Sequence, residues 1–537
     1  MKKSGSNLLL LILPLLITGI SIFCKISVGE YYLGGFYDPA YAYLMNSLNL
    51  SQLNGYGVGH FDHPGTTVQS AGAVVIKIFY MLGKSNNDIA TDVISRPEYY
   101  LSRINFLFII MTGTAIYILG IAAYWKFGNI YAAVLIQLTP LFPPTVYDHF
   151  ADVSSESLFI VAIVLFLAAV IYYTNNDESD SKSRFKSSLI LGLSCGFGLA
   201  GKIIFLPLVL IPLVLIRKFK FKMLFLFFTI IFFLIFVYPA LSMENAAKYF
   251  GWISGIATHS GKYGSGQESV IDSSTYFINL KNIFTGDLSF SFTYIVLLCT
   301  LTGGLILKTK NRLKNNYYFK LSGVIFCVMT IQIILVAKHF DPRYMITVNL
   351  LSVTGLTAVC FIAKDYCSAA LSKKLNIYIS VIIVLFSAYR LITLFSSYTD
   401  YSHRRAESEN INNYVKDNFS TLPVVYSNLI NNQVYSLYFG TDWAGSRQQT
   451  YISIIKKLYP DYFYFDRYAD NFYLTDMTEF NKKINSSEKL IFQSDTDEMA
   501  DHFMQKLKIL KQDDQLTCKE IYSNDNGEKL YEVKLKP

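Results

Sequence analysis

Apolar runs of about twenty residues recur along the first four hundred residues of the chain, and they constrain its fold more than any other feature. A helix needs roughly 20 apolar residues to cross a bilayer, with a range of about 17–25. About eleven such segments can be marked: 8–27, 101–124, 129–147, 155–173, 187–201, 203–216, 223–241, 289–307, 321–337, 344–363 and 375–397. Because backbone groups in lipid must bond within the chain, these runs predict a polytopic α-helical membrane protein.

The basic residues between these runs predict which way the chain faces. They gather in alternate loops, as at Arg217–Lys222, Lys308–Lys320 and Lys364–Lys374, and the other short loops hold few of them. Cytoplasmic loops carry this excess, so we expect a multi-pass protein of the plasma (inner) membrane with a cytoplasmic N-terminus. Segments 28–100, 242–288 and 398–537 then lie outside. The net charge of +8 comes largely from such loops. We therefore expect the lipid bilayer, and no nucleic acid, as a partner.

One further stretch, 69–84, is apolar enough to be a span. Counting it would reverse every later loop and place the basic clusters outside. We therefore interpret it as an interfacial helix in the first outer loop, with Lys77 reaching toward water.

The chain after residue 400 has a different pattern. Segments 423–427, 489–493 and 529–535 are typical of strands, and 405–418 and 497–510 are typical of helices. We expect a membrane domain over residues 1–400 and a small extracytoplasmic α/β domain over residues 401–537.

Ionisable residues at the edge of a membrane are candidates for function because they are costly there. The first such cluster follows the first span, where Asp38 precedes Pro39 at the expected start of a helix, with Tyr37 and Tyr41 beside it. Asp38 is either a helix cap or a catalytic carboxylate held at the membrane surface. The second cluster, Asp62 and His63, lies in a glycine-rich loop and is either a ligand site or a turn.

The third cluster leads into the span 155–173 and contains Asp148, His149, Asp152 and Glu156. Asp152 and Glu156 are four residues apart, which would place them on one helical face, where like charges repel unless a cation relieves them. The cluster is either a capped helix start, with Asp152 or Ser154 as the cap, or part of the functional site.

The fourth cluster lies in a tight outer loop and holds Lys338, His339 and Arg343, followed by Tyr344. The positive-inside rule disfavours cations there, so they indicate a phosphate or anionic lipid partner. His259 and Lys262 lie in a glycine-rich outer segment that lacks the spacing of a nucleotide-binding loop, and we interpret it as a loop over the site.

Together these motifs resemble the C-type membrane glycosyltransferase superfamily, especially the branch with protein O-mannosyltransferases and the aminoarabinose transferase of lipid A. The similar features, in order, are an acidic residue after the first span (Asp38), a His-Pro motif before an interfacial helix (His63-Pro64), a Gly-Leu-Ala…Lys stretch ending at Lys202, and the Arg343-Tyr344 pair. The family's adjacent acidic pair is absent, because Pro39 follows Asp38. A divalent cation is therefore allowed but not required by the sequence.

The resemblance implies a sugar donor on a polyprenyl phosphate and an acceptor that is a surface glycan, a lipid or a protein. Lys338, His339 and Arg343 would stabilise the phosphate, with Lys202 as a weaker candidate. Asp38 would act as the base in a single displacement with inversion. Asp152 or Glu156 would orient the acceptor or help to hold a cation.

Two other functions remain open from the sequence. A surface-polysaccharide polymerase or ligase also uses polyprenyl-linked sugars, but the early Asp38 argues against it. A transporter would show internal repeats and polar residues at mid-membrane, and the sequence shows neither.

Overall fold

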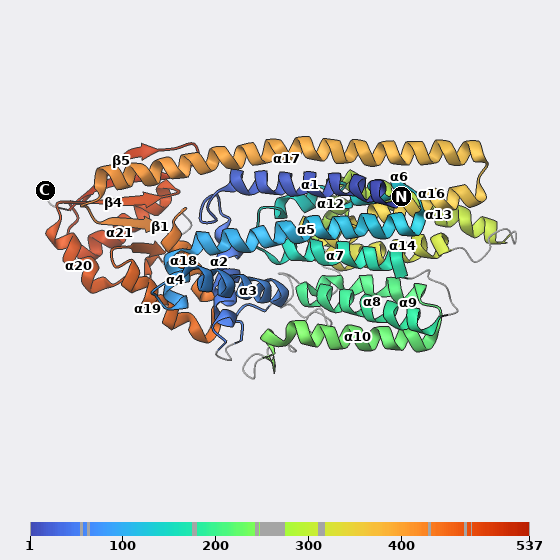
Figure 1. The fold of residues 1–537 in the computed structure, drawn as a ribbon. Coiled ribbons are helices and arrows are strands. Elements are labelled where there is room, and N and C mark those ends of the chain that lie inside the picture. The colour runs from blue at the N-terminus through green and yellow to red at the C-terminus, as the bar shows by residue number, and fades with distance from the viewer. Residues whose placement is uncertain are drawn as a thin grey trace. The chain divides into compact units, whose positions relative to one another are not determined.

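The structure of the protein is a computed structural model, and it describes residues 2–53, 57–61, 65–173, 180–241, 246–247, 274–309, 317–427, 431–466, 470–473 and 475–535 (Figure 1). The chain divides into two compact units. We call Met1–Cys24, Asn49–Val75 and Arg103–Phe395 the helical unit. We call Lys25–Leu48, Ile76–Ser102 and Ser396–Pro537 the sheet unit.

The helical unit is made of α-helices and short 3₁₀ helices, the latter labelled η. These elements are α1 (Lys2–Val28), α3 (Thr66–Gly83), α5 (Pro97–Phe127), α6 (Ile130–Gln137), η1 (Thr139–Leu141), η2 (Pro144–His149), α7 (Ser155–Tyr173), α8 (Ser181–Gly201), η3 (Ile203–Val209), α9 (Leu210–Leu215), α10 (Phe219–Val237), η4 (Tyr238–Ala240), α12 (Tyr276–Gly286), α13 (Leu288–Thr309), α14 (Tyr317–Val336), η5 (Pro342–Met345), α15 (Ile346–Asn349), α16 (Ser352–Tyr366) and α17 (Ala369–Phe419). Four of them, α1, α3, α5 and α17, also contribute residues to the sheet unit.

The predicted fold class, a polytopic α-helical membrane protein, is confirmed. In the described part of the chain, eight helices are long and apolar enough to cross a membrane, and the bent pair α12 and α13 makes nine if it counts as one span. The predicted segment 203–216 is present as a shorter apolar helical stretch, Ile203–Leu215.

Segment 129–147 differs from the single helix that its apolar content predicted. The helix α6 ends at Gln137, and the 3₁₀ turns η1 and η2 follow it. Pro140, Pro143 and Pro144 explain the break, because proline has no backbone N–H to donate to the helix. This irregular stretch places His149 beside Asp152 in the candidate site.

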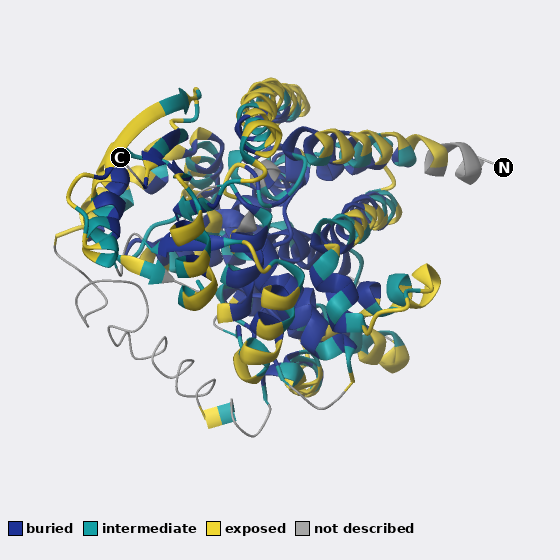
Figure 2. Ribbon diagram, turned by 90° about the vertical axis from the view of Figure 1, so that its left-hand side faces the viewer, coloured by how far each residue is buried: buried dark blue, intermediate teal, exposed yellow. Residues whose placement is uncertain are grey.

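The outer faces of the membrane helices are apolar. On α10, for example, Phe227, Ile230 and Ile235 are exposed. Figure 2 shows exposed residues along outward helix faces and buried residues between the helices. Large apolar side chains exposed in this way fit contact with lipid chains and not with water.

The helices α8 and α10 lie side by side and pack at short range (Figure 1). A Cβ atom added at Gly192 would come within 2.5 Å of the Phe228 side chain, and one at Gly196 within 2.6 Å of Phe232. Small residues four apart let membrane helices approach closely, so these two glycines set the α8–α10 spacing.

The predicted interfacial helix is present as α3, over Thr66–Gly83. Its length and composition would also let it cross a membrane. Its interfacial placement therefore stays a prediction.

The sheet unit confirms the predicted small α/β fold. Its sheet has the order β3-β2-β1-β4-β6-β5. The strands are β1 (Val424–Ser427), β2 (Phe463–Asp466), β3 (Asn471–Tyr473), β4 (Lys489–Ser494), β5 (Thr517–Ser523) and β6 (Lys529–Lys534). The helices of this unit are α2 (Tyr37–Ser51), α4 (Ile89–Ser95), α18 (Gln433–Asp442), η6 (Gly445–Arg447), α19 (Gln448–Leu458), α20 (Met477–Ser486) and α21 (Asp497–Lys511).

The centre of the sheet is parallel and its edges are antiparallel. Val425 of β1 pairs with Phe463 of β2 on one side and Phe492 of β4 on the other. Phe492 stacks on Phe503 of α21, with the ring centroids 4.1 Å apart. These apolar strands are buried as central parallel strands require. The predicted helix 405–418 is the last part of α17, a continuous helix of 51 residues.

Candidate active site

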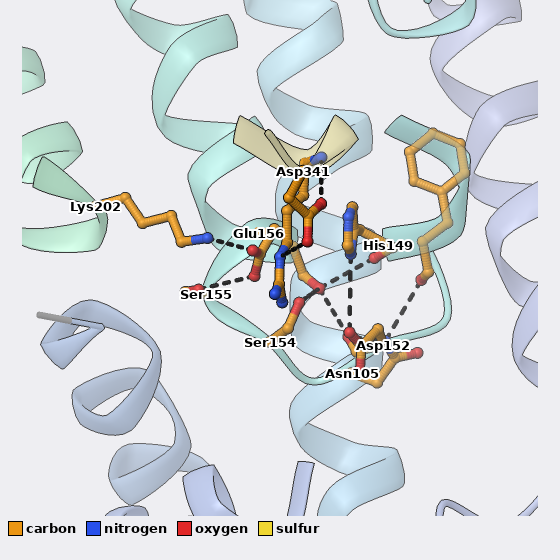
Figure 3. A network of polar contacts seen from close by, with 11 residues as sticks. Asn105, His149, Asp152, Ser154, Ser155, Glu156, Lys202 and Asp341 are labelled. Carbon is orange, nitrogen blue, oxygen red and sulfur yellow. Dashed lines mark hydrogen bonds and ion pairs between the residues drawn. The ribbon is translucent and has the colours of Figure 1, made fainter. Parts of the chain in front are cut away.

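The centre of the candidate site is a buried ion pair between α7 and the end of α8. Lys202 follows the last residue of α8, and its ammonium donates to Glu156 Oε1 in the first turn of α7. The two side chains are 5% and 4% exposed. Ser155 Oγ donates to Glu156 Oε2 at 2.8 Å. Figure 3 shows the Lys202 and Ser155 side chains converging on this carboxylate. Both charges are therefore compensated, as buried charges need to be.

The predicted common face for Asp152 and Glu156 is wrong. The helix α7 begins only at Ser155, so Asp152 lies in the preceding segment. That segment is held away from helical geometry because Asp152 O accepts hydrogen bonds from Asn105 Nδ2 at 3.0 Å and from Ser157 Oγ at 2.9 Å. His149 Nδ1 lies 3.8 Å from Asp152 Oδ2. Asp152 thus lies opposite His149, and Glu156 is paired with Lys202.

Tyr344 connects the ion pair with Arg343. The Lys202 ammonium lies 5.4 Å from the centroid of the Tyr344 ring, and the Arg343 guanidinium lies 5.6 Å from it. Both distances are within the range of cation–π attraction. Gln332 Nε2 of α14 donates to Tyr344 O at 2.8 Å, which fixes the backbone under the ring. The tyrosine is therefore in contact with two cations that are far apart in the sequence.

Of the two cations beside the Tyr344 ring, Arg343 is the more accessible to solvent. Asp341 caps the turn η5, since its Oδ1 accepts from Arg343 N at 2.9 Å, and its Oδ2 lies 2.8 Å from Arg343 Nε. The Arg343 side chain is 49% exposed. Its Nη groups can therefore bind an anion without breaking the fold of the turn.

The remaining cations of the fourth cluster are close in sequence but differ in environment. The His339 ring lies 6.2 Å from the Tyr344 ring, centroid to centroid, so it belongs to the same cluster. Lys338 is buried, with 3% exposure. We name Glu156, Lys202, His339, Arg343 and Tyr344 the cation–tyrosine cluster.

The start of α3 is attached to the same end of α8. Gly65 N donates to Gly201 O at 3.1 Å, and Thr66 Oγ1 donates to Ala200 O at 3.4 Å. The last carbonyls of a helix have no partner within it, and here α3 supplies donors to two of them. The predicted Gly-Leu-Ala…Lys stretch thus meets the segment that follows His63-Pro64.

Asp38 belongs to the sheet unit, at the start of α2. Its backbone is not helical (φ −99°, ψ 117°), and its side chain is exposed. The helical conformation continues from Pro39 onward, as the Asp-Pro pair predicted. Asp38 is thus an exposed residue at the start of α2.

Glu98 holds the loop that leads to Asp38, and sequence reasoning missed it. Its Oε2 accepts from Tyr31 N at 2.8 Å, and its Oε1 accepts from Tyr41 Oη at 2.7 Å. The two donors lie on either side of Asp38 in the sequence. Burial, with the Glu98 charge, raises the pKa of Tyr41 well above its ordinary value, so this phenol stays a donor. The available signal was an acidic residue in the first turn of an apolar helix.

Some predicted site residues cannot be placed. Asp62, His63, His259 and Lys262 lie outside the described residues, as do the side chains of Tyr37 and Asp148. Among the residues that the structure describes, no group of three or more His, Cys, Asp or Glu side chains could hold a metal ion.

Comparisons with known proteins give the class of the fold. No family model matches the sequence, and no curated protein matches it. One solved structure that the chain resembles is the crystal structure of ArnT, an aminoarabinose transferase, from Cupriavidus metallidurans bound to undecaprenyl phosphate, which has the C-type membrane glycosyltransferase fold. The likeness has a TM-score of 0.51 at 11% identity and covers 96% of this chain and 97% of that one.

A second solved structure is an oligosaccharyltransferase from Archaeoglobus fulgidus tethered to an acceptor peptide. It is also 11% identical, with a TM-score of 0.40, and the match covers 79% of this chain and 59% of that one. The fold that the motif order predicted is therefore confirmed by the ArnT structure.

Proposed function

We propose that the protein is a membrane glycosyltransferase that moves a sugar from a polyprenyl phosphate to an acceptor on the outer face of the membrane. The acceptor is a surface glycan, a lipid or a protein. The fold shared with ArnT supports a transferase of this type, and the undecaprenyl phosphate bound to ArnT supports a lipid-linked donor.

The observation that carries the proposal is the contact of Lys202 and Arg343 with one tyrosine ring. Cations at the ends of membrane helices are costly, so Lys202 and Arg343 mark a candidate functional site. Glu156 already neutralises Lys202, so we assign Lys202 the role of orienting Tyr344. Arg343, half exposed, would exchange its Asp341 contact for the phosphate of the donor.

The proposed reaction is a single displacement. The acceptor hydroxyl oxygen attacks the anomeric carbon, and the bond from that carbon to the phosphate oxygen breaks. Its electron pair leaves with the polyprenyl phosphate, whose charge Arg343 stabilises. The hydroxyl proton passes to the Asp38 carboxylate, which acts as general base. The sugar is transferred with inversion at the anomeric carbon.

The proposed topology follows from the loop charges. The N-terminus lies in the cytoplasm, and the α/β domain, residues 401–537, lies outside. Asp38 then lies in the first outer segment, and Arg343 lies in the short outer loop between the spans 321–337 and 344–363. This topology requires α3 to remain on the outer face.

Binding of the lipid can be tested directly. The full chain in nanodiscs should bind undecaprenyl phosphate, as detected by native mass spectrometry, and the variant Arg343→Gln should bind it at least tenfold more weakly. The surface glycans, lipids and proteins of cells with and without the protein, compared by mass spectrometry, should differ by one sugar in one of these classes. Equal lipid binding by both proteins together with no difference in any of the three classes would overturn the proposal.

A further inference from the structure

A buried carboxylate occupies the sharp bend between α12 and α13, which meet at 94°. Asp287 is 8% exposed. Its Oδ1 accepts from Ser289 N at 2.9 Å, Ser289 Oγ at 2.6 Å and Phe290 N at 3.2 Å, and so caps α13. Its Oδ2 accepts from Asn349 Nδ2 at 3.2 Å. The carboxylate therefore fixes both the bend and the neighbouring asparagine.

Asn349, at the end of α15, is 2% exposed. Its Nδ2 donates to Asp287 Oδ2 and also to Thr145 Oγ1 at 3.3 Å. Because a carboxylate oxygen only accepts, the amide nitrogen must face Asp287. Asn349 Oδ1 then points elsewhere, and no hydrogen-bond donor of the described residues reaches it. The amide is thus held between the Asp287 carboxylate and the Thr145 hydroxyl.

These side chains line a cavity of about 270 Å³. Its wall also includes Asn282, Phe290 and Phe340. A volume of that size equals roughly nine waters at ~30 Å³ each. This volume is just below the range of roughly 300–1,000 Å³ that is typical of sites for drug-sized ligands. Amides, a carboxylate and a hydroxyl beside two aromatic rings suit one small ring that has hydroxyl groups and apolar C–H faces.

The cavity shares one turn with the cation–tyrosine cluster. The turn η5 supplies Pro342 and Met345 to the cavity and Arg343 to the cluster. The same turn therefore holds one wall of the cavity and Arg343.

We propose that this cavity binds one monosaccharide ring, with the amide side chains of its wall bonding sugar hydroxyls and Phe340 packing against the ring. The identity of the ring as a sugar rests on the proposed function. The ring belongs either to the lipid-linked donor or to a glycan acceptor, and both present the same chemistry to the cavity.

The test uses the full chain in nanodiscs and a panel of methyl glycosides of common hexoses and pentoses. Binding is measured by saturation-transfer-difference NMR. We expect at least one glycoside to bind and Asn349→Leu to reduce its signal at least fivefold. Phe340→Ala, on a half-buried loop residue, should reduce it as well, and it keeps the test valid if Asn349→Leu does not fold.

Asn376→Leu is the matched control. Asn376 Oδ1 is also buried without a donor among the described residues, but it lines a different cavity of the helical unit, beside Lys373 and Ser380. This variant should leave glycoside binding unchanged. If no glycoside binds, or if folded Asn349→Leu and Phe340→Ala bind as well as the natural protein, the proposal is overturned.

Sugar 1-phosphates separate the two sources of the ring. If the cavity takes the donor's sugar, a sugar 1-phosphate should bind more tightly than its methyl glycoside, and Arg343→Gln should remove the gain. Equal binding of the two probes assigns the cavity to the acceptor. Undecaprenyl phosphate binding, measured on the same preparations, reports on the proposed function separately, so failure of one proposal is distinguishable from failure of the other.

Discussion

The Lys202 ammonium is paired with the Glu156 carboxylate inside the helical unit, although 46 residues separate them in the sequence. Removing one partner leaves the other charge buried and uncompensated. We expect Glu156→Leu and Lys202→Met each to lower the free energy of unfolding by about 3–5 kcal/mol. Denaturant unfolding of the purified protein in detergent would measure the loss.

The double variant Glu156→Leu/Lys202→Met is the control for this prediction. It removes both charges, so its stability should lie above that of either single variant. Losses that simply add in the double variant would contradict the pairing.

Apolar content predicted the membrane helices and the α/β domain because both signals are local in the sequence. The broken stretch 139–149 was missed because an apolar count does not register that prolines lack an N–H. The Asp152 error has a different origin. Helical spacing was assumed where Asn105, about 47 residues away, binds the Asp152 carbonyl and holds a loop.

The candidate site was partly predictable for a related reason. Glu156, Lys202 and Arg343 stood out because charges next to apolar runs are costly wherever they lie. Glu98 and Asp287 were missed because their partners, Tyr31 and Asn349, are 67 and 62 residues away. The sequence shows each acidic residue next to an apolar run, but no local pattern shows which distant residue it pairs with.

Arg343 is expected to contribute to donor binding and not to folding. A hydrogen bond to a charged group contributes about 1.5–3 kcal/mol, which corresponds to roughly 10- to 150-fold in affinity. Arg343→Gln should weaken undecaprenyl phosphate binding by about that factor, and Arg343→Lys should weaken it less, since lysine keeps the charge but loses the planar fork. Native mass spectrometry of lipid titrations would measure both.

Because the Arg343 side chain is half exposed, both variants should unfold at the temperature of the natural protein. A fall in Tm that matches the fall in binding would assign Arg343 a structural role instead.

Asp38 should be needed for turnover but not for stability. A positioned general base contributes about 10²- to 10⁴-fold to the rate, so Asp38→Asn should lose roughly that factor in kcat. Its side chain is exposed, so the variant should unfold as the natural protein does. Turnover would be followed as release of polyprenyl phosphate from the lipid-linked donor.

Tyr41→Phe is the comparison for that prediction, because it removes the hydroxyl that Glu98 accepts and leaves the Asp38 carboxylate in place. We expect a smaller loss of kcat than for Asp38→Asn. Near-normal turnover by folded Asp38→Asn would exclude Asp38 as the base.

Asp92 should make the sheet unit sensitive to acid. Burial disfavours its charged form, but hydrogen bonds from Ser85, Tyr100 and Arg96 outweigh burial and hold its pKa below the ordinary value. Arg96 Nη2 lies 2.6 Å from both carboxylate oxygens. A lowered pKa in the folded state stabilises the protein above the unfolded-state value of about 3.9, and this contribution disappears as the pH falls through the folded-state pKa.

The stability of the natural protein should therefore fall on acidification below about pH 4, and Asp92→Asn should make that fall shallower, because its side chain has no proton to gain. Tm measured as a function of pH gives the acid slope of stability for the natural protein and for Asp92→Asn. Asp501→Asn, which removes an exposed carboxylate from α21, is the matched control. Since Arg96 and Tyr100 contact Asp92 directly, an acid slope that stays the same in Asp92→Asn would mean that these contacts do not depend on its charge.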